Sequence, residues 1–196
     1  MYFDNEYTAT KLRRWESYLN NYRLPAWDDI PDFGLYMEQV IELLKTHLDY
    51  LPPELKDDEF ITSSTINNYV RIKVMPEPIK KRYYRVHIAY LIIILTLKQS
   101  LSIAMIRSLL PKDLPPESVE KAYTMYTARH RATAEYFKKQ VALAAAPILG
   151  CKTDSEMAAD NTEDLIAAAA ISAGFSRLLA TKLLLLKDEQ SGSAED

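Results

Sequence analysis

Apolar residues recur along most of the chain at the spacing of three and four that is typical of helices, and no convincing alternation of apolar and polar residues indicates strands. Ten prolines mark most of the joints between these segments. The chain is therefore expected to be mainly α-helical. The predicted helices run from about 33 to 50, from 62 or 63 to about 72, from about 86 to 99, from 102 to about 110, from about 119 to 146, and from about 162 to 187.

Capping residues and prolines set the expected ends of the first helices. Asp32 is a candidate N-cap for the first, and Thr62 or Ser63 for the second. Pro76 and Pro78 should force extended backbone after the second helix. The segment "DLPPES" indicates a boundary near residue 113. The predicted organisation is an N-terminal extension (1–30), a helical domain (31–112), a helical C-terminal region (113–188) and a disordered tail (189–196).

The short helix predicted at about 63–72 has one wholly polar side. At about 100° per residue, three further polar side chains fall within roughly 60° of Ser64, while apolar residues gather opposite. Amide and guanidinium groups on a short helix can make paired hydrogen bonds to base edges in the DNA major groove. This side is therefore a candidate DNA-reading surface, unless its asparagines cap local backbone or face solvent. Its residues are Ser64, Asn67, Asn68 and Arg71.

Positive charge is concentrated just after this helix. Residues 71–85 contain six cations and one acid in a chain whose formal net charge is -3. Such segregation is typical of a phosphate-binding surface, although a basic run can also be plain solvated surface. The segment "IKKRYYR" predicts a small two-stranded wing. In it, Lys81, Tyr83 and Arg85 would point one way, and Arg82 and Tyr84 the other.

Other chemistry has little support in the residues. Three scattered histidines and four distant glycines form no metal motif and no phosphate-binding loop, and Cys151 has no second cysteine to pair with. We expect no enzyme activity, no cofactor and no metal. The N-terminus lacks the apolar core of a signal peptide, and Arg177 and Lys182 interrupt the apolar run at 165–186. A cytoplasmic protein without a membrane span is expected.

The stretch "TINNYVRIKVMPEPIKKRYYRVHIAYLIIILTLKQSLSIAMIRSLL" is similar to the DNA-binding domain of MerR-type regulators. Those domains place a recognition helix carrying a tyrosine before a proline, a basic wing and two further helices. Together with "LPAWDDIPDFGLYMEQVIELL", the stretch resembles bacterial proteins grouped as domain of unknown function 1836. MerR-type domains usually have glycine after the recognition helix and at the wing turn. Here Lys73 and "PEPIKK" stand there, so both turns must be built differently.

The resemblance implies a winged helix-turn-helix with at most a small two-stranded wing, in a sequence-specific transcription regulator that binds double-stranded DNA. The C-terminal helices would form a homodimer and respond to an unidentified small-molecule or protein effector, or they would simply pack on their own chain. An alternative is a degenerate helix-turn-helix that binds another protein and no DNA. The expected DNA contacts are Ser64, Asn67, Asn68, Arg71, Lys73, Lys80, Lys81, Arg82, Tyr84 and Arg85.

Overall fold

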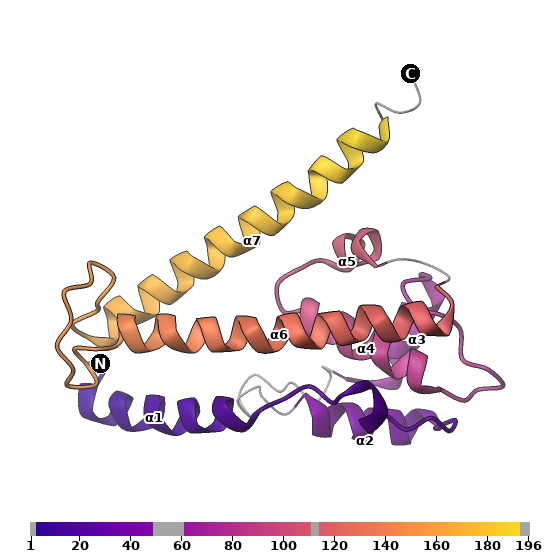
Figure 1. The fold of residues 1–196 in the computed structure, drawn as a ribbon, viewed down its shortest axis with the longest axis horizontal. Coiled ribbons are helices and arrows are strands. Elements are labelled where there is room, and N and C mark those ends of the chain that lie inside the picture. The colour runs from indigo at the N-terminus through magenta and orange to yellow at the C-terminus, as the bar shows by residue number, and fades with distance from the viewer. Residues whose placement is uncertain (1–2, 49–60, 111–113, 193–196) are drawn as a thin grey trace. The chain divides into compact units, whose positions relative to one another are not determined.

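The chain is mainly helical, as predicted. The computed structural model describes residues 3–48, 61–110 and 114–192 (Figure 1). Within these ranges no β-strand forms, and the extended pairing is limited to two isolated bridges, Leu35 with Tyr83 and Ile79 with Arg82. The elements are α1 (Asn5–Asn21), the short 3-10 helix η1 (Trp27–Asp29), α2 (Met37–His47), α3 (Ser63–Arg71), α4 (Arg85–Leu97), α5 (Ile103–Leu109), α6 (Pro116–Ala144) and α7 (Thr162–Gly192).

The contacts within the chain group its residues into two compact units. One unit contains residues 1–22 and 131–196, and the other contains residues 23–130. The division therefore joins the two ends of the chain and passes through α6, whereas the predicted organisation was linear with a boundary near residue 113. Each unit is described by itself below.

The core of the unit at 23–130 is built around α4. Every residue from His87 to Leu95 is buried, so this helix packs on all sides, as the apolar run "IAYLIIIL" requires. Helix α2 packs on both α3 and α4. It contributes the fully buried Val40 and Leu44, and α3 contributes the fully buried Ile66. A shared apolar core therefore fixes α3 relative to α2 and α4.

The first part of α6 belongs to the same core. Tyr123 is fully buried, and its hydroxyl donates a 2.9 Å hydrogen bond to the backbone oxygen of Pro25. Burial raises the pKa of Tyr123 well above its usual value, so the hydroxyl stays a donor. One turn on, the Tyr126 hydroxyl lies 2.6 Å from Thr96 Oγ1 near the end of α4. The domain therefore continues past residue 113 into α6.

Helix α2 begins at Met37, later than predicted, and Asp32 does not cap it. Leu35 and Tyr83 exchange two backbone hydrogen bonds, 2.8 and 2.9 Å long, which hold the chain before α2 in an extended conformation. The N-cap is consequently Tyr36. Residues 49 and 50, where the predicted helix was expected to end, lie outside the described ranges.

The unit that joins the two ends of the chain contains α1, which Asp4 caps by accepting hydrogen bonds from the first turn. Side-chain contacts connect α1 to distant segments of this unit. Asn5 Nδ2 donates to the backbone oxygen of Asp160 at 3.1 Å. The rings of Trp15 and Phe137 meet edge to face with centroids 5.8 Å apart. These contacts give the N-terminal segment a packing partner that periodicity alone did not indicate.

Helix α7 begins at Thr162, as predicted, but ends at Gly192 instead of near residue 187. The first residues of the predicted tail are therefore helical. Lysine, aspartate, glutamate and glutamine at 187–190 all tolerate a helix, and the first strong helix breaker is Gly192. The rest of the predicted tail lies outside the described residues.

By length and composition alone, the stretch Thr162–Leu186 of α7 could cross a membrane, and none of its apolar window is buried. No other helix among the described residues meets both criteria. The large apolar side chains of α7 are exposed instead of packed. They include Ile171, Phe175, Leu178, Leu179, Leu183, Leu185 and Leu186.

Candidate nucleic-acid interface

Helix α3 has the orientation that its sequence predicted. Thr62 caps it, its Oγ1 accepting a 3.1 Å hydrogen bond from the backbone N–H of Thr65. On one side, Ile66 and Tyr69 are buried against the neighbouring helices. The opposite side carries the four polar residues singled out above. Ser64, Asn67 and Arg71 are exposed, and Asn68 is half-buried.

Two of these polar side chains are paired. Arg71 Nη2 donates a 2.7 Å hydrogen bond to Asn68 Oδ1, one turn of helix earlier. The amide oxygen of Asn68 is thus used by a side chain and not by local backbone. The pair restricts the rotamers of both residues, while the amide nitrogen of Asn68 and the other guanidinium nitrogens still carry donors. Donors are thereby held in place on the exposed side of α3.

The polar side of α3 opens onto a broad hollow of about 780 Å³. Seven residues of α3 line it, together with Lys98 just after α4 and Ile103 at the start of α5. Sequence reasoning missed these last two residues. Nothing in the local pattern could have found them, because both follow α4 and lie far from α3 in the sequence.

The chain leaves α3 through a Schellman motif. The backbone N–H of Val74 donates to the oxygen of Tyr69 at 3.1 Å, and that of Lys73 donates to Val70 at 2.9 Å. This geometry places Lys73 at a φ of 56°, where glycine is the usual residue. Its side chain is exposed. A position with left-handed backbone, where glycine is the usual residue, therefore carries a cation here.

A second left-handed turn follows at Ile79–Arg82. These two residues exchange backbone hydrogen bonds of 3.0 Å each. Between them, Lys80 and Lys81 have φ values of 49° and 63°. Positive φ at both central residues is the mark of a type I′ turn, for which Asn-Gly is the common pair. Two exposed lysines therefore occupy the tip of a minimal hairpin.

The predicted alternation along a two-stranded wing is wrong. Lys81 is exposed at the tip, Tyr83 is buried, and Arg85 is the first residue of α4. The left-handed lysines reverse the chain at this point, so no continuous strand can run through residues 79–85. Tyr83 pairs instead with Leu35. Tyr83 is therefore a core residue, as Tyr69 is.

Arg82, one of the expected phosphate contacts, already binds its own domain. Its Nη2 donates to the Tyr36 hydroxyl at 2.9 Å, and its Nη1 donates to the backbone oxygen of Gly34 at 3.3 Å. The guanidinium also lies over the Tyr36 ring, 4.6 Å from the centroid. This arrangement holds the tight turn against the extended segment before α2.

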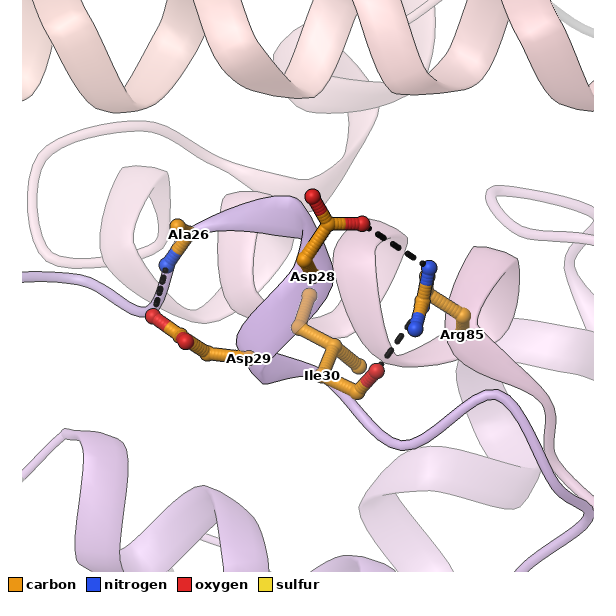
Figure 2. Close-up of polar contacts among 5 residues, drawn as sticks. All are labelled: Ala26, Asp28, Asp29, Ile30 and Arg85. Atoms are coloured by element: carbon orange, nitrogen blue, oxygen red, sulfur yellow. Dashed lines mark hydrogen bonds and ion pairs between the residues drawn. The ribbon is translucent and has the colours of Figure 1, made fainter.

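Arg85 is engaged in the same way, as Figure 2 shows. Its Nε donates a 2.8 Å hydrogen bond to the backbone oxygen of Ile30, and its Nη1 lies 3.4 Å from Asp28 Oδ1. The backbone N–H of Ala26 donates to Asp29 Oδ2 at 3.0 Å and closes η1 beside it. Because Arg85 is only partly exposed and its Nε and Nη1 donate within the domain, we assign it to holding η1 on the start of α4.

Tyr84 caps α4 through a buried histidine. The backbone N–H of Tyr84 donates to His87 Nδ1 at 3.0 Å, and His87 Nε2 lies 2.9 Å from the backbone oxygen of Glu77. A backbone N–H can only donate, so Nδ1 accepts and Nε2 carries the proton. His87 is thus a core residue. Within the described ranges, no group of three or more histidine, cysteine, aspartate or glutamate side chains is placed to hold a metal ion.

Of the six cations of the basic segment, Arg71 pairs with Asn68 on α3, and the other five fall into two classes. Arg82 and Arg85 are used inside the domain. Lys73, Lys80 and Lys81 are exposed, and over the part of the chain that the structure describes none of them has a carboxylate within ion-pair distance. All three lysines are free to meet an external anion.

Comparison with known proteins places this unit in a family. No curated protein and no solved structure matches the chain. A family model described as "Domain of unknown function (DUF1836)" matches residues 25–126, just over half of the chain. The match lies inside the compact unit of residues 23–130 and runs past residue 110 to include the buried Tyr123. The chain belongs to the family of domain of unknown function 1836.

Proposed function

We propose that this protein is a sequence-specific regulator of transcription that binds double-stranded DNA through a MerR-like winged helix-turn-helix. Helices α2 and α3 form the helix-turn-helix, and α3 enters the major groove. The observation that carries the proposal is the exposed polar side of α3, with its Asn68–Arg71 pair, beside three exposed lysines that have no ion-pair partner among the described residues. Such a surface combines groups for base edges with groups for phosphates.

Each polar residue of α3 has a role in this proposal. Asparagine can bind adenine N6 and N7 in a paired manner, and arginine can bind guanine O6 and N7. We assign Asn67, Asn68 and Arg71 to base edges, and Ser64 to a base edge or a flanking phosphate. Tyr84, the N-cap of α4, is assigned a weak contact with the DNA.

The lysines are assigned to phosphates, and their backbone conformation supports this role. A residue with a side chain costs about 1–2 kcal/mol in the left-handed region relative to the right-handed one. Non-glycine residues in sparsely populated regions concentrate at functional sites. Among the described residues, the non-glycine residues with positive φ are Lys73, Lys80 and Lys81, all in the basic segment. In this proposal the Lys80–Lys81 turn, closed by the Ile79–Arg82 bridge, is the minimal wing.

We also propose a homodimer in which a second copy covers the apolar side chains of α7. Phe175, Leu178 and Leu179 each expose more than 60% of their surface, which is unusual for a helix without a partner. A two-fold symmetric dimer suits a palindromic operator. The alternative occupants of α7 are a lipid bilayer or a different protein.

Salt dependence tests DNA binding against the protein-interaction alternative. With three to four cations on phosphates, log K plotted against log salt should fall with a slope of about -3 to -4 per protomer. The measurement is fluorescence anisotropy with a mixed-sequence duplex at several salt concentrations. A slope near zero, or no binding at low salt, would contradict the proposed function. A protein interface would instead depend mainly on apolar residues.

A further inference from the structure

Lys98 shares the hollow with the polar side of α3, although it is distant from α3 in sequence. It is the C-cap of α4, its backbone N–H donating to Ile94 O at 2.8 Å, and its side chain is exposed. The hollow of about 780 Å³ lies between it and α3. It therefore adds a cation to this surface that lies outside the basic segment of residues 71–85.

The position of Lys98 is fixed by packing on both sides. Ile94 and Leu95 before it are buried in the core, and Leu101 after it is buried as well. In the same turn of the chain, Thr96 Oγ1 lies 2.6 Å from the Tyr126 hydroxyl of α6. A functional group on such a supported element is presented more precisely than one on a loop.

The charge of Lys98 is also available. Within the described residues, no carboxylate lies within ion-pair distance of its Nζ. Its neighbours in the hollow are hydroxyl, amide and guanidinium side chains of α3 and the apolar Ile103. This lining offers donors and positive charge and contains no acid, which suits an anionic polymer.

We propose that Lys98 binds a backbone phosphate of the DNA strand that borders the groove occupied by α3. The sugar-phosphate backbone of that strand then lies in the hollow. This inference rests on the proposed function. The major groove is about 12 Å wide and is flanked by phosphates, so a helix inserted in it has a sugar-phosphate strand alongside. With α3 facing the bases, a cation across a hollow from α3 is placed for that strand. Lys98 is thus a phosphate contact and not a base reader.

The test compares Lys98→Ala, Lys98→Arg and Lys121→Ala with the wild type, using the duplex that wild-type protein selects from random sequence and a scrambled duplex. Lys121 is exposed on α6 and does not line the hollow, so its loss removes the same charge elsewhere. Affinity is measured by anisotropy at several salt concentrations. Circular dichroism melting checks that each variant is folded.

Lys98→Ala should weaken binding to both duplexes by the same factor. It should also make the plot of log K against log salt shallower, reducing the magnitude of its slope by about 0.9. The selected motif should not change, Lys98→Arg should restore the slope, and Lys121→Ala should match the wild type. If Lys98→Ala and Lys121→Ala have equal slopes while the wild type binds DNA, this inference is overturned and the proposed function stands. If the wild type binds neither duplex, both are overturned.

Discussion

Substitutions at Lys80 and Lys81 can separate the backbone strain of the tight turn from the charge of its side chains. Both residues have positive φ, at 49° and 63°, and both side chains are exposed. The double substitution Lys80→Asn and Lys81→Gly installs the pair that type I′ turns favour. It removes two charges and leaves the backbone in a conformation that it adopts more easily.

The change should raise stability and lower DNA affinity together. Relief of the left-handed conformation contributes about 1–2 kcal/mol at a residue that becomes glycine. The greater freedom of glycine in the unfolded chain offsets about 0.4–1 kcal/mol of this gain. The net gain should be about 1 kcal/mol, which raises the melting temperature of a chain of this size by about 2–4 °C. Loss of two phosphate contacts should reduce the magnitude of the salt slope by about 1.8.

The assay pairs thermal melting with anisotropy titrations of one duplex at several salt concentrations. The matched control is Lys80→Ala with Lys81→Ala, which removes the same charges without relieving the turn. Both double variants should lose the same affinity, and only the Asn-Gly variant should be stabilised. If the Asn-Gly variant bound DNA as the wild type does at every salt concentration, these lysines would not be phosphate contacts. If the Asn-Gly variant melted at a lower temperature than the alanine control, the positive φ assigned to Lys80 and Lys81 would be contradicted.

Three further predictions concern other parts of the molecule. Burial lowers the pKa of His130 below its ordinary value of 6.5, so folding stability should be full above pH 6.5 and fall as the pH drops toward the folded pKa. His130→Gln should flatten this decline in urea titrations between pH 7 and 5, and an unchanged decline would contradict the reasoning. Gly34→Ala should cost about 1–3 kcal/mol in urea unfolding, because the added Cβ would lie 2.8 Å from Arg82 Cβ; a neutral effect would show that the turn can shift freely. Phe175→Asp with Leu179→Asp should convert a dimer to a monomer in light scattering, and an unchanged mass would refute the proposed α7 interface.

The elements that sequence predicted well are those determined by local pattern. The two sides of α3 follow from the spacing of Ile66 and Tyr69 against Asn67 and Arg71, and the apolar run of α4 could only be a core helix. These features depend on residues within a few turns of one another. A helical period therefore suffices to predict them.

The features that sequence missed depend on contacts between distant residues or on unusual backbone. The start of α2 is set by the pairing of Leu35 with Tyr83. Arg82 and Arg85 were expected to contact phosphates, because nothing near them in the sequence indicates a partner within the fold. Their actual partners lie about fifty residues away in the chain. The turn at Lys80–Lys81 carried no glycine or asparagine to mark its positive φ. Charge alone could not separate cations used within the fold from those left exposed.

The central claim is that the polar side of α3 reads DNA sequence, and selection of genomic fragments by the purified protein tests it most directly. The selection is run with wild type, with Asn67→Ala and Asn68→Ala together, and with the Lys80→Ala and Lys81→Ala control. The wild type should enrich a short, palindromic motif. The asparagine variant should lose or change that motif, and the lysine variant should keep it at lower affinity. No enriched motif, with all three proteins binding DNA equally poorly, would contradict the claim.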